Sequence, residues 1–478
     1  MEDVKQVGAA IPAVSQAFRD RLRNLRGMWR DIAVSLGKTP RISPELPADD
    51  AEVLREQMRD CLQGRGGEVS ARVRAATLGR SYLALNDEGR RNFLRLLAEE
   101  FGTEAAQVDA AMAAVAAAKT PAARLVAERA LRDALESPRQ RLLTQFNALP
   151  EGVKFLVDMR AELLSLVKSD AAMQALEADL KELLSAWFDV GFLELQRITW
   201  RSPALILEKI MAYEAVHAIQ GWRDLKNRLD SDRRLYAFFH PRMPDEPLIF
   251  VEVALVRGMA GNVHELLDEH APVGDPSKAD TAIFYSINNA QRGLVGISFG
   301  NFLIKRVVDS LSHEFPNLKA FATLSPLPGF RAWLDERLAE GEVKLLTPAE
   351  HRIVVALAQG LSVGTSLKAI LSTPWVEDEG VADTLKGVLM RLCVRYLSEK
   401  REGTGRALDP VAHFHLSNGA RIERLNWLAD TSSKGMTQAV GMMVNYLYKL
   451  SDIEANHEAY TGQGRTAMSG PIRSLLKE

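Results

Sequence analysis

The sequence predicts an α+β protein in which an all-α helical N-terminal domain, residues 1–190, precedes an α/β domain, residues 191–478, that contains a helical insertion. Three observations predict this class. Apolar residues recur with helical spacing through the first region. Short runs rich in β-branched and aromatic residues begin after Gly191. From about residue 330 to 400 the helical spacing returns, and such segregation of helices and strands favours an α+β class.

The composition is that of a folded protein without a global attraction to polyanions. A chain of 478 residues exceeds what one hydrophobic core usually supports, which favours two domains. Sixty Lys and Arg oppose 62 Asp and Glu, so the net charge of -2 predicts neither a nucleic-acid partner nor a membrane partner. Cys61 and Cys393 form no CxxC pair, and neither a secretory signal nor a long apolar run is evident. These features predict a cytoplasmic protein.

The N-terminal region contains a clear amphipathic helix and an alanine-rich stretch. One apolar stripe follows the capping-type pair Asn86 and Asp87, and its members are Phe93, Leu94, Leu97, Ala98 and Phe101. The stretch from Glu104 to Ala127 has little bulk to fill a core. We expect its helices to pack closely against neighbouring helices or against another subunit.

The second half reads as strands and helices in alternation. The runs RRLYAFFH and PLIFVEVALV flank a proline-rich turn, so an antiparallel hairpin is expected. ELQRITW is expected to form a strand, and a long helix from about Pro203 to Leu229 follows it. Further on we expect a strand at Thr281–Ile287, a helix at Asn301–Phe315, a strand at Leu318–Leu324 and more strands between Val411 and Trp427.

A glycine-spaced loop precedes the helix that begins near Asn301. Gly293, Gly296 and Gly300 would let the backbone approach a ligand, and a helix start capped by Asn301 offers free N–H groups to a phosphate. The loop matches neither the dinucleotide fingerprint nor the Walker pattern. A tight turn without a ligand remains the alternative.

The same loop contains a GxSxG pattern centred on Ser298. This pattern is typical of the nucleophile elbow of α/β-hydrolases, which needs a strand ending at the serine and a doubly wound parallel sheet around it. The preceding half of the chain is helical and has no oxyanion motif of the HGG type. A serine hydrolase is therefore an alternative rather than the preferred interpretation.

Two further segments offer groups that could react. Ser325 ends a predicted strand and enters Ser-Pro-Leu-Pro-Gly, where the prolines stiffen the backbone and aim the hydroxyl. His413 and His415 alternate along a predicted strand and would face opposite sides. A turn serine and a structural histidine are the alternatives for these residues.

The sequence contains neither a complete zinc-protease motif nor a biotin attachment motif. HELLDEH begins at His264 like a zinc-protease helix, but Asp268 occupies the position of the second histidine. No Met-Lys-Met triplet is present for biotin attachment. We therefore expect no metal site and no cofactor.

Several long segments, in order, resemble the malonyl-CoA decarboxylase family. They are HPRMPDEPLIFVEVAL, FLIKRVV after the glycine loop, TLSPLPGF, DPVAHFHLSNGA, LNWLAD and MVNYLY. The resemblance covers most of residues 190–460 and extends to the helical region by position. It implies a helical, oligomerising N-terminal domain joined to a catalytic domain of the GNAT acyltransferase type, assembled as a homotetramer.

The resemblance also implies roles for individual residues. Ser325 matches the family's catalytic serine, a proton acceptor, and His415 its proton donor, while Tyr448 matches a tyrosine near that site. The matching acyl-CoA-binding loop consists of Val295, Gly296, Ile297, Ser298, Phe299, Gly300 and Asn301. Some members have a glutamate where this chain has Ser298.

The implied reaction is the decarboxylation of malonyl-CoA to acetyl-CoA and CO₂ without metal or biotin, in fatty-acid or malonate metabolism. A serine hydroxyl would stabilise the carbonyl or enolate, and a histidine would protonate C2. A GNAT-type acyltransferase is the nearest alternative, followed by a serine hydrolase and a noncatalytic helical scaffold.

Overall fold

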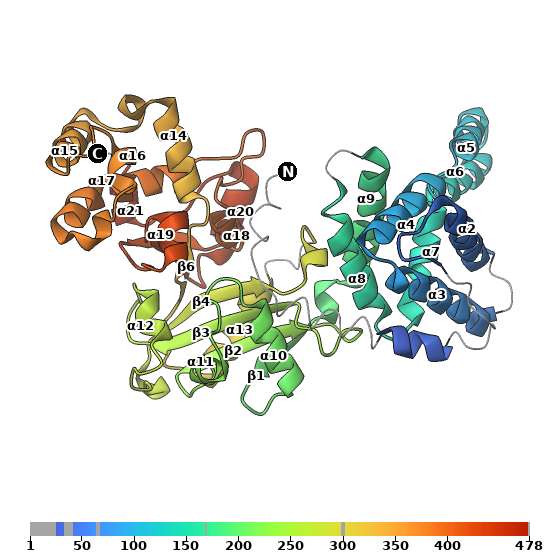
Figure 1. Cartoon of the computed structure of the whole chain (residues 1–478), viewed down its shortest axis with the longest axis horizontal. Coiled ribbons are helices and arrows are strands. Elements are labelled where there is room, and N and C mark those ends of the chain that lie inside the picture. Colours follow the sequence, from blue (N-terminus) through green and yellow to red (C-terminus); the bar gives the residue numbers. More distant parts are fainter. Residues whose placement is uncertain (1–24, 33–41, 64–66, 168–169, 298–301, 477–478) are drawn as a thin grey trace.

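The computed structural model describes residues 25–32, 42–63, 67–167, 170–297 and 302–476. A helical N-terminal part lies at one end of the molecule, a twisted sheet occupies the middle, and a second group of helices lies beyond the sheet (Figure 1). The α+β class is therefore confirmed. Among the described residues no helix is both long and apolar enough to cross a bilayer.

The N-terminal part is all-α, as expected. Its main helices are α2 Ala48–Leu62, α3 Gly67–Ala84, α4 Asp87–Glu100, α5 Ala105–Ala117, α6 Pro121–Leu135, α7 Pro138–Thr144, α8 Gly152–Leu163 and α9 Ala171–Trp187. The Asn86 side chain caps α4 by accepting the Gly89 N–H. All five members of the predicted stripe are buried, because the 3.6-residue period keeps them on the face that packs into the bundle.

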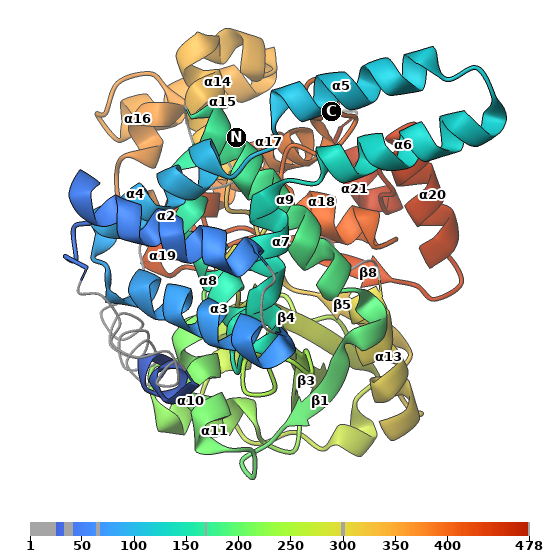
Figure 2. The ribbon, with the colours of Figure 1, turned by 90° about the vertical axis from the view of Figure 1, so that its right-hand side faces the viewer.

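The alanine-rich segment forms an exposed hairpin of helices. Helices α5 and α6 pack on each other and project beyond the rest of the bundle (Figure 2). No residue of α5 is buried, and in α6 only Ala127 is. Leu125 and Val126 are 69% and 72% exposed. Beyond the packing of α5 on α6, the described residues of this chain therefore leave most of the hairpin uncovered. Of the two expected kinds of neighbour, the one that a single chain cannot test is another subunit.

The sheet is mostly antiparallel. Its strands are β1 Glu194–Ile198, β2 Arg233–Phe239, β3 Ile249–Val256, β4 Thr281–Asn289, β5 Ala320–Thr323, β6 Ser325–Pro326, β7 Arg421–Asn426 and β8 Met443–Tyr448. The order is β1-β2-β3-β4-β5-β8-β6, with β7 paired to β8. The predicted β2–β3 hairpin is confirmed by antiparallel register from Arg233↔Ala254 to Phe238↔Ile249.

Strands β4 and β5 form the only parallel pair among the described strands. Helix α13, Phe302–Glu314, connects them. Their pairing runs only from Thr281↔Ala320 to Phe284↔Thr323, whereas β4 continues to Asn289. The two strands therefore separate beyond Phe284 and leave one side of β4 without a partner from β5.

The predicted long helix Pro203–Leu229 is wrong. The structure has two helices, α10 Ala204–Tyr213 and α11 Trp222–Arg228, joined by a loop. The buried Glu214 carboxylate accepts the backbone N–H groups of Val216 and His217. These bonds satisfy donors that a continuing helix would have used, so the first helix ends there.

The helical insertion is confirmed between the strands of the second half. It comprises α14 Phe330–Leu345, α15 Pro348–Gly360, α16 Leu367–Leu371 and α17 Glu379–Ser398. Thr347 and Glu350 form a capping box at the start of α15. Beyond the insertion lie α18 Pro410–Ser417, α19 Ser433–Ala439, α20 Ile453–Gln463 and α21 Gly470–Ser474, and α12 Val263–Leu267 follows β3.

The expectation of a strand beginning near Val411 is also wrong, because His413 and His415 lie on helix α18. Asp409 caps this helix through the Ala412 N–H, and Pro410 occupies its first turn. An acidic N-cap followed by proline at N1 is a helix-start signal that outweighs the local β-like alternation. The strand itself begins only at Arg421.

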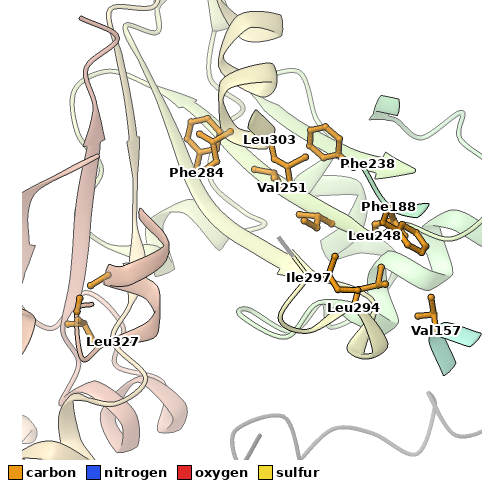
Figure 3. Close-up of a cluster of buried hydrophobic side chains, with 14 of the residues drawn as sticks. Val157, Phe188, Phe238, Leu248, Val251, Phe284, Leu294, Ile297, Leu303 and Leu327 are labelled. Carbon is orange, nitrogen blue, oxygen red and sulfur yellow. The ribbon is translucent and has the colours of Figure 1, made fainter. Parts of the chain in front are cut away.

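The helical part and the sheet share one continuous hydrophobic core. Val157 of α8 lies beside Leu294 and Ile297 of the glycine loop, and Phe188 lies close to Leu248 (Figure 3). The loop that precedes α13 is thus built against the N-terminal helices. The helical region therefore contributes directly to the shape of that loop.

Candidate active site

Ser325 sits where the sheet changes partners. It directly follows Leu324, and with Pro326 it forms β6, paired with Val444 and Met443 of β8. The expectation that a proline-flanked strand end would hold this serine agrees with the structure. Its side chain is nearly buried, with 6% of the residue exposed.

His415 reaches Ser325 from helix α18. Its Nε2 lies 3.1 Å from Ser325 Oγ, and its Nδ1 lies 2.7 Å from the Tyr448 hydroxyl. His415 is 3% exposed and Tyr448 2%. Residues from three separate segments thus converge in one water-poor place. The structure therefore brings together the predicted residues Ser325, His415 and Tyr448. His415 lies on helix α18, however, and not on the predicted strand.

Burial keeps this cluster neutral. Desolvation lowers the pKa of His415 to about 3 and raises the pKa of Tyr448 well above its usual value. The Tyr448 phenol therefore retains its proton and donates to Nδ1, which leaves the proton of the neutral ring on Nε2. In this tautomer, Nε2–H donates to Ser325 Oγ.

Sequence analysis missed two residues of this cluster, Thr323 and Tyr446. Ser325 Oγ donates to Thr323 Oγ1 at 2.8 Å, and Thr323 Oγ1 also accepts the Tyr446 backbone N–H at 3.1 Å. The Tyr446 ring stacks on His415 with centroids 4.5 Å apart. Both positions lie two residues from a predicted site residue on a strand, so the period-2 alternation would have indicated them.

The glycine loop is held by the helical N-terminal part. Arg160 of α8 donates to the carbonyl oxygens of Gly293 and Val295 at 2.5 and 2.9 Å, and also to the Glu177 carboxylate. A Cβ on Gly293 would lie 1.8 Å from the Val157 carbonyl oxygen, so only glycine fits. Gly296 has φ of +76°, which also favours glycine.

The predicted loop lies only partly within the described residues. Val295 and Gly296 are exposed, while Ile297 is buried. Ser298, Phe299, Gly300 and Asn301 lie outside the described residues, so neither the GxSxG serine nor the proposed cap is located. The largely antiparallel sheet, however, is not the doubly wound parallel sheet that a nucleophile elbow needs.

The segment that resembles a zinc-protease helix has other contacts. His264 Nε2 accepts the Thr431 backbone N–H at 2.9 Å. Its ring nitrogen thus helps to anchor the segment after β7.

The cluster has the chemistry of a neutral donor site. A serine hydroxyl and an imidazole N–H lie side by side, and within the described part of the chain no carboxylate hydrogen-bonds either group. Preorganised donors of this kind stabilise an oxygen on which negative charge develops. A serine protease triad differs, because there a carboxylate orients the histidine.

Comparisons with known proteins cover nearly the whole chain. The family profile described as malonyl-CoA decarboxylase C-terminal domain matches residues 191–478, and the corresponding N-terminal-domain profile matches residues 101–188. The mitochondrial malonyl-CoA decarboxylase of Mus musculus is 40% identical over 439 residues, covering 88% of this chain and 85% of the relative. That of Anser anser anser is 39% identical over 426 residues, covering 85% and 84%.

Solved structures agree. The crystal structure of malonyl-CoA decarboxylase from Rhodopseudomonas palustris aligns with a TM-score of 0.81 and 42% identity, covering 88% of this chain and 99% of that one. The structure from Agrobacterium vitis gives a TM-score of 0.80 and 44% identity, covering 89% and 100%. Both the sequence and the architecture are therefore similar to those of bacterial relatives along their full length.

Proposed function

This chain belongs to the malonyl-CoA decarboxylase family, and from that premise we propose that it converts malonyl-CoA into acetyl-CoA and CO₂ with Ser325 and His415 as its catalytic residues. The observation that carries the proposal is the 3.1 Å contact between Ser325 Oγ and His415 Nε2 inside a buried, neutral cluster. The enzymatic class follows from family membership. The roles of the two residues are the proposed part.

The reaction breaks the bond between C2 and the carboxylate carbon of the malonyl group. The electron pair of that bond moves into the thioester carbonyl, so CO₂ leaves and an enolate forms. Hydrogen bonds that strengthen as charge gathers on the enolate oxygen lower this barrier. Ser325 supplies one such bond when its hydroxyl turns from Thr323 toward the substrate.

His415 completes the reaction by giving its Nε2 proton to C2. A thioester enolate is a stronger base than the imidazolate that forms when a neutral ring gives up its proton, so even a neutral ring can protonate it. The Tyr448 hydroxyl at Nδ1 stabilises the ring as the proton departs. Solvent then restores the proton, and the net consumption is one proton per CO₂ released.

The separation of β4 from β5 supports a GNAT-type acyl-CoA cleft. In this proposal the thioester end of the acyl-CoA enters beyond Phe284, where β4 lacks its parallel partner, and the loop before α13 faces the CoA phosphates. Val295, Gly296 and Ile297 contribute the described part of that loop. Ser298 to Asn301 complete it by resemblance.

Assembly and location are further parts of the proposal. The exposed apolar side chains of the α5–α6 hairpin support an oligomer, and we propose a homotetramer. Light scattering after size exclusion measures the mass of the assembly.

Cys61 and Cys393 are free and buried, which supports a reducing compartment, and we propose the cytoplasm. The vertebrate relatives are named as mitochondrial, so cell fractionation tests this location.

The decisive experiment incubates the purified protein with malonyl-CoA and follows CO₂ and acetyl-CoA, with and without a chelator and avidin. We expect both products in equal amounts and no inhibition, as a metal-free and biotin-free reaction requires. An acyltransferase would need an acceptor amine and release no CO₂. A thioester hydrolase would give malonate and free CoA instead.

The residue assignments are tested with three variants. Ser325→Ala and His415→Ala should each lower kcat by about 10²-fold or more while retaining CoA binding. Ser298→Ala separates the serine hydrolase: it should lower kcat less than Ser325→Ala does, whereas a hydrolase that uses the GxSxG serine would show the reverse order. Near-normal turnover in both of the first two variants would refute the proposed roles.

A further inference from the structure

The helical insertion contacts both segments that carry the proposed catalytic residues. Tyr396 lies on α17, near the end of the insertion, and is 2% exposed. Its ring packs against Phe330 and Trp333 of α14, with centroids 5.8 and 5.5 Å apart. The aromatic packing leaves the ring little freedom to move, so its hydroxyl occupies a defined position.

On one side the Tyr396 hydroxyl contacts the segment that leads to His415. It donates to Asp409 Oδ2 at 2.9 Å, and Asp409 Oδ1 accepts the Ala412 N–H at 2.7 Å. Asp409 is fully buried and caps α18. A hydrogen bond to this carboxylate therefore fixes the start of the helix, and His415 lies one turn beyond Ala412.

On the other side the same hydroxyl abuts the corner that holds Ser325. A Cβ placed on Gly329 would lie 2.3 Å from the Tyr396 hydroxyl oxygen and 3.4 Å from Cζ. Gly329 has φ of −104°, which any residue adopts, so the contact rather than the backbone angle requires glycine here. The corner is thus seated directly on the hydroxyl.

We propose that the Tyr396 hydroxyl is a positioning group that sets the distance between Ser325 and His415, by contacting the serine corner at Gly329 and the cap of the histidine helix at Asp409. The inference rests on the proposed roles of Ser325 and His415. It assigns a purpose to the helical insertion: α14 and α17 act as a spacer between the two reacting groups.

The principal test is Tyr396→Phe, which removes only the hydroxyl. A 1 Å misplacement of a reacting group costs up to about 10²-fold in rate. Loss of one of several constraints should cost less, so we expect kcat to fall roughly tenfold. KM for malonyl-CoA should stay within about twofold, because the acyl-CoA loop is held separately by Arg160.

The matched control is Tyr82→Phe in the helical N-terminal part. Tyr82 is also a buried tyrosine that donates to a carboxylate, Glu162, at 2.5 Å. It should lose a similar amount of thermal stability while keeping wild-type kcat. If Tyr82→Phe lowered kcat as much as Tyr396→Phe, the effect would be one of general stability and the proposal would fall.

The contact at Gly329 gives a second, independent test. Gly329→Ala should reduce kcat sharply, because the new Cβ displaces the corner or the tyrosine. Combined with Tyr396→Phe the clash disappears, since the nearest remaining atom is Cζ at an ordinary contact distance. The double variant should therefore be more active than Gly329→Ala alone.

The outcomes separate this inference from the function itself. Wild-type kcat in Tyr396→Phe, or a double variant no better than Gly329→Ala, would overturn the positioning role. If Ser325→Ala and His415→Ala also remained active, the proposed catalytic residues would fail as well. If those two variants are inactive and Tyr396→Phe is normal, only the positioning role fails.

Discussion

Two buried polar clusters lie on opposite faces of the same sheet, and they solve the problem of burial differently. His415 is neutral, and its two hydrogen-bond partners, Ser325 and Tyr448, are neutral hydroxyl groups. On the other face Arg228 pairs with Asp224 and Glu252, and its side chain is 3% exposed. One cluster avoids charge, whereas the other compensates it.

The charged cluster is closely interconnected. Glu214 accepts hydrogen bonds from Ser286 and Asn288 as well as from the backbone. Burial, reinforced by Glu214, raises the pKa of Glu252. Such a network holds α10 and α11 on the sheet. The difference teaches that the cluster proposed to react is the one in which a hydroxyl can change its hydrogen-bond partner without leaving a buried charge unpaired.

The sharpest way to break this comparison is to remove the central cation of the charged cluster. Arg228→Ala leaves Asp224 and Glu252 buried without their partner, so we expect the free energy of unfolding to fall by about 3–5 kcal/mol. The kcat of the molecules that remain folded should not change. Urea denaturation and kcat normalised to folded protein measure the two effects, and Ser325→Ala should show the opposite pattern.

A smaller effect is expected from the neutral cluster. Tyr448→Phe removes the donor to Nδ1, so the imidazole no longer has a fixed tautomer and kcat should fall by about tenfold. KM and the unfolding midpoint should change little. Unchanged turnover in steady-state assays would mean that another group fixes the ring.

The stability of the fold should depend on the neutrality of His415. Its pKa is about 3 in the folded state against 6.5 for a free ring, so the unfolded chain binds a proton first as the pH falls. Stability from this group is present above pH 6.5 and declines by about 1.4 kcal/mol per unit below it. His415→Gln should remove that share of the acid loss, as unfolding curves at pH 7 and 5.5 will test.

The smallest expected effect is on the pH profile. Because His415 in the free enzyme stays neutral down to about pH 3, it should contribute no limb near pH 6.5 to kcat/KM. The profile between pH 5.5 and 7.5 should therefore lack the slope that a solvated histidine would produce. An acid limb near pH 6.5 that is lost only when His415 is replaced would contradict the neutral state of this ring.

The sequence was informative where one local signal determined the structure. The strand at Thr281, the helix before Phe315 and the β2–β3 hairpin were predicted because their periodicities are unambiguous. The strand assigned to His415 failed because the apolar alternation was read without the start signal at Asp409 and Pro410. The helix assigned to Pro203–Leu229 failed because the side chain that ends it, Glu214, is buried by partners distant in sequence.

The site was predictable as a set of residues but not as an arrangement. Proline and glycine around Ser325 indicated a rigid corner. Nothing local indicated that Tyr448 would meet His415, or that Arg160, more than a hundred residues upstream, would hold the loop at Gly293. Such contacts depend on tertiary packing, which single-segment patterns do not contain.

The grip of Arg160 on the Gly293 and Val295 carbonyls has a consequence for how this enzyme can be divided. A fragment that begins at residue 191 would lose both that guanidinium and the Val157 surface on which Gly293 rests. A cut at the boundary between the two halves should therefore leave Ser325 and His415 in the shorter piece but remove the support of the loop that is proposed to bind the nucleotide end of CoA.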